Sequence, residues 1–144
     1  MAAILVSIDI AAPPEVVWDD VRHIDRHVEW MNDAEKITFT SKARSGVGTA
    51  FDCLTKVGPL RMTDRMEITD WDEEQRMGVR HVGLVTGEGQ FTLTPAADGG
   101  TRFTWDERLT FPWWMGGPVG GVVGGIILTR IWRKNLALLA ARFD

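Results

Sequence analysis

The last part of the chain, from Pro118 to Asp144, constrains the fold more than any other stretch. Apolar residues recur there at spacings of three and four, which is the period of one face of an α-helix. Near the middle of this stretch apolar side chains surround the helix almost completely, which is typical of a buried helix. We therefore expect one long helix, gripped by the rest of the protein.

Two pairs of glycines lie inside this predicted helix, Gly120 with Gly121 and Gly124 with Gly125. Each glycine costs about 1 kcal/mol of helix stability relative to alanine. Such a cost implies that another backbone or a ligand comes close to the helix here. We expect the missing side chains to leave a cavity beside the helix. The alternative is close packing of the helix on a sheet with no void.

The chain before this helix alternates between apolar and polar residues, as β-strands with one buried face do. The predicted strands are 3–11, 36–41, 49–57, 60–71, 76–85, 87–95 and 101–111. A helix from Pro13-Pro14 to about Asp25 and a helical turn at 26–31 follow the first strand. Short turns join the later strands, so these neighbours must be antiparallel. The sequence predicts an α+β fold in one domain, residues 1–144, in which a curved antiparallel sheet of about seven strands holds the long helix.

Four stretches of the chain resemble one known superfamily. They are Ala11 to Trp18, the Trp30-Met31 turn, Met66 to Asp72, and the long helix that follows Gly116-Gly117-Pro118. On these residues the chain resembles the START-like helix-grip superfamily (SRPBCC), and within it the polyketide cyclase/dehydrase branch. The resemblance implies a hydrophobic cavity for lipids, polyketides, hormones or other apolar molecules. Many members of this superfamily bind a ligand and catalyse no reaction.

Composition excludes several other classes of protein. The net charge is −4 and the basic residues are spread along the chain, which argues against nucleic-acid binding. Cys53 is the single cysteine, so an internal disulfide and a cysteine zinc site are excluded, as fits a reducing cytoplasm. The first residues alternate and lack a basic start, so they predict a strand and not a signal peptide. Prolines and glycines interrupt the uncharged run 109–129, whereas a membrane-spanning helix needs about 20 predominantly apolar residues.

Metal and cofactor sites are not expected either. His23 and His27 are four residues apart, but no HExxH-type pattern surrounds them, and we expect both at the surface. The chain has no glycine-rich loop of the kind that holds phosphate groups. We expect a cytoplasmic monomer or dimer without metal or cofactor. Its partner would be a hydrophobic small molecule, with no stable insertion into a membrane.

Three polar residues fall on strand faces that should point inward: Asp64, His81 and Glu107. A buried carboxylate or imidazole must find a partner or change its protonation state. Three such groups in one cavity would form an acid–base site, which could enolise a ketone or dehydrate an aldol. These residues are therefore the catalytic candidates.

Structural interpretations compete with this site. For Asp64 we favour an ion pair with Arg61 or Arg65 at the end of a strand. His81 fits a hydrogen-bonded core position as well as it fits a cavity wall. For Glu107 we favour the cavity.

Arg130 is the one charge in the apolar half of the long helix. It would either anchor an acidic group of a ligand or neutralise Glu107. Trp113 and Trp114 lie in a glycine-flanked loop, where we favour a cap over the open end of the fold. A moving lid or a membrane-touching tip is the alternative. The full set of predicted ligand-binding residues is Trp30, Phe51, Met66, His81, Trp105, Glu107, Trp113, Gly124, Ile127 and Arg130.

The leading functional expectation is binding or transport of a lipid-like, polyketide-like or isoprenoid compound. The first alternative is a cyclase or aromatase that uses Glu107 and His81 as acid and base, with Arg130 to steady an enolate. The second is a protein-interaction module. An enzyme should have an inward titratable group with a perturbed pKa. A carrier should have a cavity whose polar groups are all paired, and an interaction module a collapsed cavity with an exposed apolar patch.

Overall fold

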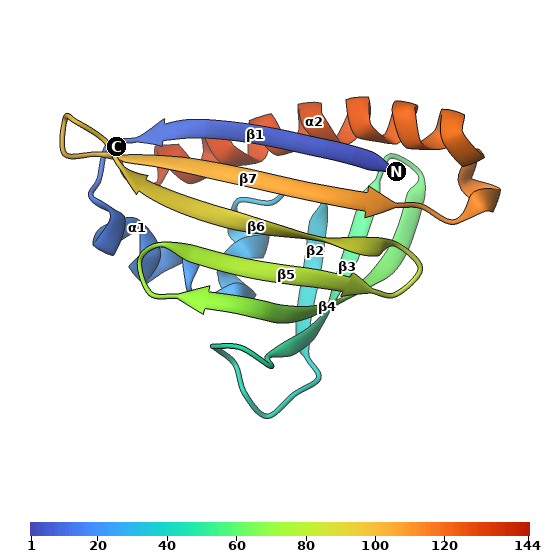
Figure 1. Cartoon of the computed structure of the whole chain (residues 1–144), viewed down its shortest axis with the longest axis horizontal. Coiled ribbons are helices and arrows are strands. Elements are labelled where there is room, and N and C mark those ends of the chain that lie inside the picture. Colours follow the sequence, from blue (N-terminus) through green and yellow to red (C-terminus); the bar gives the residue numbers. More distant parts are fainter.

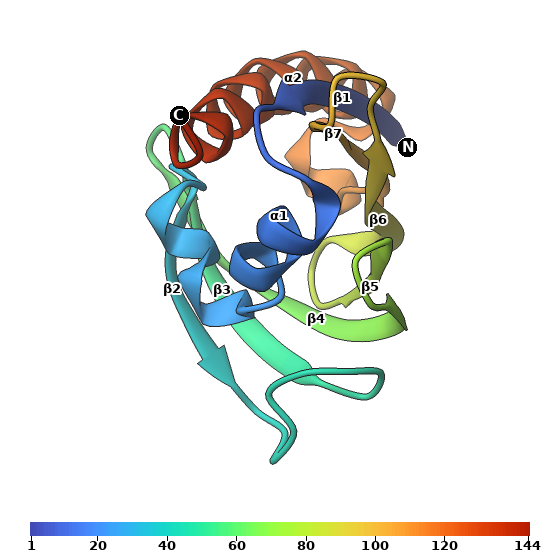
Figure 2. The same ribbon diagram turned by 90° about the vertical axis from the view of Figure 1, so that its left-hand side faces the viewer.

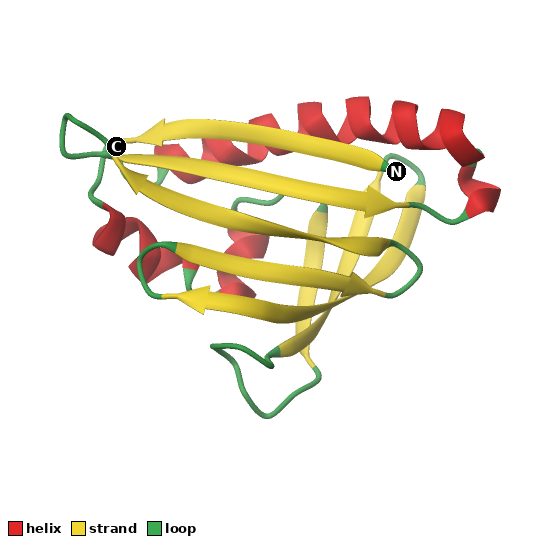
Figure 3. Ribbon diagram, viewed as in Figure 1, coloured by secondary structure: helices red, strands yellow, loops and turns green.

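The computed structural model describes all 144 residues and contains one seven-stranded antiparallel sheet with the helices on one side (Figures 1 and 3). The strands are β1 (Ala2–Ile10), β2 (Ala34–Phe39), β3 (Ala50–Val57), β4 (Leu60–Asp72), β5 (Arg76–Val82), β6 (Thr86–Pro95) and β7 (Thr101–Thr110). The helices are α1 (Pro14–Val21), the 3₁₀ helices η1 (Ile24–Glu29) and η2 (Trp113–Met115), and α2 (Gly117–Ala141).

The strand order in the sheet is β1-β7-β6-β5-β4-β3-β2, so the first strand pairs with the last. Ala2 lies opposite Leu109 and Ile10 lies opposite Thr101. The sheet curves round α1 and η1, and α2 lies along β1 above the hollow side (Figure 2). This arrangement confirms the predicted α+β helix-grip fold.

Strand positions differ from the prediction by a few residues. The strand predicted at 36–41 begins earlier, at Ala34, and the one predicted at 76–85 ends at Val82. The helical turn predicted at 26–31 is η1, which begins at Ile24. Alternation marks which face of a strand is buried, but the residue at which pairing begins depends on the neighbouring strand.

The hydrophobic core lies where α1, η1 and the second half of α2 meet the sheet. Trp30 is its largest fully buried side chain, and its indole contacts the rings of Phe91, Phe103 and Trp105. The other fully buried apolar residues are Ile4, Ile10, Val17, Val21, Ile24, Phe103, Leu136 and Leu139. This end of the protein is densely packed.

The first half of α2 is largely exposed on its outer side, and the expectation of a helix buried all round is wrong for this half. Val119 is 72% exposed and Val122 is 66% exposed. The reason is that α2 has no element packed on its outer side. Gly121 and Gly125 instead face the start of β1: a Cβ at Gly121 would lie 3.7 Å from Met1, and one at Gly125 would lie 3.5 Å from Ala2. None of the helices combines the length and apolar character needed to cross a bilayer.

Gly120 and Gly124 face the other way, and both are tightly enclosed. A Cβ at Gly120 would overlap the carbonyl oxygen of Met115, where the chain turns from η2 into α2. A Cβ at Gly124 would lie 2.8 Å from the ring of Phe111. Each glycine pair therefore serves two contacts: its first glycine faces η2 or the end of β7, and its second faces the start of β1.

Candidate ligand cavity

A cavity of about 370 Å³ lies between the sheet and α2. Of its 31 lining residues 22 are hydrophobic. Strands β3, β4, β5 and β7 supply one wall, and Gly120, Gly124, Ile127, Leu128 and Trp132 of α2 supply the other. The cavity predicted beside the glycine-bearing helix is therefore present. The missing glycine side chains do not create it, because Met1, Ala2, Phe111 and Met115 lie close to the positions that those side chains would take. Its lining includes one polar cluster, made of Asp64, His81 and Glu107.

Strand alternation and register bring this cluster together. Asp64 lies between Met62 and Met66 on the inward face of β4, and Met66 pairs directly with His81 of β5. Glu107 comes from β7, which is separated from β5 by the whole width of β6. Its side chain must therefore cross β6 to reach His81.

Gly89 of β6 makes this crossing possible. It lies opposite Glu107 in the sheet, and a Cβ at this position would overlap the Cγ of Glu107. Any other residue at position 89 would push the Glu107 side chain away from its present place. Gly89 was not among the predicted site residues, although a glycine within a strand is a known sign of close approach by another group.

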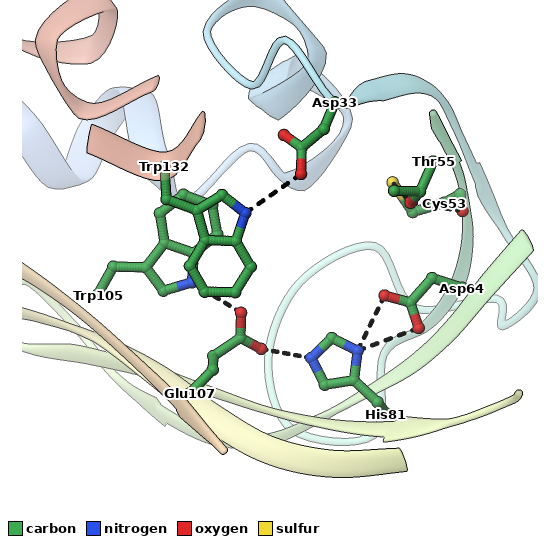
Figure 4. Close-up of polar contacts among 8 residues, drawn as sticks. All are labelled: Asp33, Cys53, Thr55, Asp64, His81, Trp105, Glu107 and Trp132. Carbon is green, nitrogen blue, oxygen red and sulfur yellow. Dashed lines mark hydrogen bonds and ion pairs between the residues drawn. The ribbon is translucent and has the colours of Figure 1, made fainter. Parts of the chain in front are cut away.

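His81 donates hydrogen bonds to carboxylates on both sides (Figure 4). Its Nδ1 lies 2.9 Å from Oδ2 and 3.0 Å from Oδ1 of Asp64. Its Nε2 contacts Oε1 of Glu107, whose other oxygen, Oε2, accepts a hydrogen bond of 2.8 Å from Nε1 of Trp105. Every polar atom of the imidazole ring is therefore engaged within the protein.

The two carboxylates set the charge of His81. Burial by itself would lower the pKa of this imidazole, but the hydrogen bonds and charges of Asp64 and Glu107 outweigh burial and raise the pKa to about 10. At neutral pH His81 is therefore an imidazolium, and both of its nitrogens carry a proton. The formal charges of the imidazolium and its two carboxylates sum to −1, and the ring has no free nitrogen to serve as a base.

A second polar chain joins the cavity wall to the loop before β2. The indole of Trp105 stacks on that of Trp132, with ring centroids 4.0 Å apart and planes 6° from parallel. Nε1 of Trp132 donates to Oδ2 of Asp33 at 3.2 Å, and Nδ2 of Asn135 donates to Oδ1 of the same carboxylate at 2.8 Å. Asn135 also accepts a hydrogen bond from the backbone N–H of Asn32. These contacts hold α2 at a fixed place over the cavity.

His27 and Cys53 also line the cavity, and both are uncharged at neutral pH. His27 was expected at the surface, but it is buried, with Nε2 hydrogen-bonded at 2.7 Å to the carbonyl oxygen of Val21. Burial lowers its pKa to about 4. Burial likewise raises the pKa of the Cys53 thiol to about 12. The surface prediction failed because the packing of η1 against the sheet is not visible in the local sequence.

Most predicted site residues do line the cavity: Phe51, Asp64, Met66, His81, Trp105, Glu107, Gly124 and Ile127. The ion pair favoured for Asp64 is absent, because Asp64 points inward. Arg61 pairs instead with Glu35 at 3.2 Å, and Arg65 lies 3.8 Å from Asp52.

Three predicted residues lie outside the cavity. Trp30 belongs to the solid core, with 1% of its surface exposed. Trp113 is 84% exposed, so it does not form the predicted cap over the open end of the fold. Arg130 is exposed on α2 and makes no ion pair, so neither alternative weighed for it, a pair with Glu107 or an anchor for a ligand acid in the cavity, is present. Glu107 is hydrogen-bonded to His81 and Trp105 instead.

Comparison with known proteins identifies the group to which the chain belongs. The whole chain, residues 1–144, matches the family model described as polyketide cyclase / dehydrase and lipid transport. The chain belongs to this family. A search of the curated proteins finds no match for it.

Solved structures share the fold of this polyketide cyclase/dehydrase and lipid transport family member. A Thermus thermophilus protein superposes with a TM-score of 0.81 at 21% identity, covering 98% of this chain and 96% of that one. The Zhui aromatase/cyclase from a Streptomyces species gives 0.79 at 13%, covering 97% and 92%. A START superfamily protein from Mycobacterium smegmatis gives 0.78 at 11%, covering 99% and 97%. At these identities the likeness establishes the fold.

Proposed function

We propose that the protein binds an apolar small molecule, such as a lipid-like, polyketide-like or isoprenoid compound, between the sheet and α2. The observation that carries this proposal is a cavity of about 370 Å³ with a mainly hydrophobic lining. Ligand pockets typically measure about 300–1,000 Å³ and combine apolar walls with a few polar groups. No buried side-chain polar atom lacks a hydrogen-bond partner, as expected of a binding cavity. The lipid transport in the family description supports the same function.

Acid–base catalysis is the second candidate, and the inward Asp64–His81–Glu107 cluster favours it. One structural neighbour is an aromatase/cyclase by name. General acids work best when their pKa lies near the working pH, whereas the pKa of His81 is raised to about 10. Arg130, the cation expected to steady an enolate, is on the outside of α2. Binding without turnover is therefore our first choice. A protein-interaction module was expected to have a collapsed cavity, and the cavity here is not collapsed.

Titration with the neutral, environment-sensitive dye Nile red tests the binding proposal. Val79 is a half-buried cavity residue, whereas its neighbour Arg80 points outward and pairs with Glu67. We expect the dye to bind the wild-type protein and Arg80→Trp with equal affinity. Val79→Trp should weaken binding at least about tenfold, because the indole occupies the ligand's space.

Circular dichroism checks that each variant is folded, and Met62→Trp gives a second cavity-filling variant. Unchanged dye affinity in both folded cavity variants would refute the proposal. For the catalytic candidate, a ten-carbon methyl ketone in heavy water is followed by NMR. Deuterium exchange at its α-carbon that depends on protein and is lost in Glu107→Gln would favour catalysis over binding alone.

A further inference from the structure

We infer that the cavity selects apolar molecules whose polar group donates a hydrogen bond, such as a hydroxyl or an ammonium, and rejects those whose polar group is a carboxylate. The inference rests on the proposed binding function and specifies the chemical class of its ligand. It follows from the charges and hydrogen bonds of the lining residues.

The cavity lining carries negative charge and almost no positive charge. No lysine or arginine is among its 31 residues. Its carboxylates are Asp33, Asp64 and Glu107, and His81 is its single cation, since buried His27 is neutral at pH 7. A ligand carboxylate would therefore meet net repulsion. His81 and Glu107 are buried, and repulsion near buried charges is stronger than at the surface.

The charged donor of the lining and its two indole donors are already in use. His81 gives one N–H to Asp64 and the other to Glu107. The indole N–H groups of Trp105 and Trp132 are taken by Glu107 and Asp33. A ligand carboxylate would have to displace one of these protein carboxylates and leave it buried without its partner, which is strongly unfavourable.

Acceptors, in contrast, remain available. Each carboxylate oxygen has two lone pairs, and each oxygen of Glu107 accepts one hydrogen bond within the protein. A ligand hydroxyl could donate to the remaining position without disturbing His81. A ligand ammonium would in addition neutralise the net charge of the cluster.

Three ligands of equal chain length test this inference: decanol, decylamine and decanoate, each competing with Nile red at pH 7. We expect decanol and decylamine to displace the dye, and decanoate to compete at least about tenfold more weakly. Decanoate can also enter as the neutral acid. With an ordinary carboxyl pKa of about 4.5, this route limits the loss of decanoate affinity relative to decanol to roughly 300-fold at pH 7.

Glu107→Gln removes one negative charge from the cluster. It should reduce the difference in affinity between decanoate and decanol, called the gap below, several-fold. Asp64→Asn serves the same purpose if the first variant folds poorly. Glu67→Gln is the matched control, because Glu67 is exposed on β4 and pairs with Arg80; it should leave the gap unchanged.

Decanoate binding as tightly as decanol to the wild-type protein would overturn the inference and leave the binding function standing. The same holds if the dye binds but neither decanol nor decylamine displaces it. If the dye also fails to bind, the proposed function fails together with the inference.

Discussion

Two buried histidines of this protein differ in charge at neutral pH, and their immediate neighbours explain the difference. The Nε2 of His27 faces a backbone carbonyl oxygen, and aromatic rings surround it, so burial dominates and lowers the pKa to about 4. His81 lies between two carboxylates, which raise its pKa to about 10 against the effect of burial. Burial alone therefore does not determine whether an imidazole is charged.

We predict that the two histidines give the folded protein its greatest stability near pH 6.5. The raised pKa of His81 stabilises the fold fully below pH 6.5, and this contribution is lost as pH rises from 6.5 toward 10. The lowered pKa of His27 means that the unfolded chain binds more protons between pH 4 and 6.5, so stability falls as pH drops through this range. Each histidine changes the free energy of unfolding by a few kcal/mol at most, on the order of 1.4 kcal/mol per pKa unit.

Urea unfolding at pH 5, 6.5 and 9 measures this profile, and NMR of the imidazole nitrogens assigns it to residues. The expected result is that His81 stays protonated at pH 8 while His27 stays neutral at pH 5. A His81 ring that loses its proton near pH 6.5 would contradict the charge assigned to the cluster.

Among the elements, the sequence predicted the buried faces of the strands and the extent of α2, but not which side of α2 is covered. Alternation placed Asp64, His81 and Glu107 on inward faces, and they do line the cavity. It could not identify their partners, because pairing across the sheet depends on register between strands. The sequence also could not exclude Arg130 from the site, because a helix that is apolar all round does not show which of its sides the sheet will cover.

Glycines on the two faces of α2 should respond differently to alanine. A Cβ at Gly125 would make ordinary contact with Ala2, so Gly125→Ala should stabilise the protein by up to about 1 kcal/mol through helix propensity. A Cβ at Gly120 would overlap the backbone of Met115, so Gly120→Ala should destabilise it by more than about 1 kcal/mol. Urea unfolding of both variants measures the difference. Equal effects would show that the close turn into α2 tolerates a side chain.

At the scale of the whole molecule, the space between the sheet and the helices holds a densely packed core at one end and the cavity at the other. The solid half, around Trp30, holds α1, η1 and the second half of α2 in place. The hollow half is bordered by the more exposed part of α2. The overall plan could be predicted because strand order and element lengths permit few alternatives. The size and charge of the cavity could not, because they arise from side chains that meet only in the folded protein.

A ligand that fills the cavity should therefore stabilise the whole fold. Binding to the native state alone adds about 2.7 kcal/mol when the ligand is at one hundred times its Kd. For a protein of this size we expect the Tm to rise by several degrees with decanol. Thermal unfolding followed by circular dichroism measures this shift. Val79→Trp should show little or none of it, and a wild-type Tm that is independent of decanol would argue against a ligand in this cavity.

The pairing of β1 with β7 has a consequence for how the protein is made. A ribosome releases Ala2–Ile10 well before their partner, Thr101–Thr110. Until then β1 has no neighbour in the sheet, and strands without neighbours readily join other chains. Residues 11 to 100 therefore emerge while this edge is open.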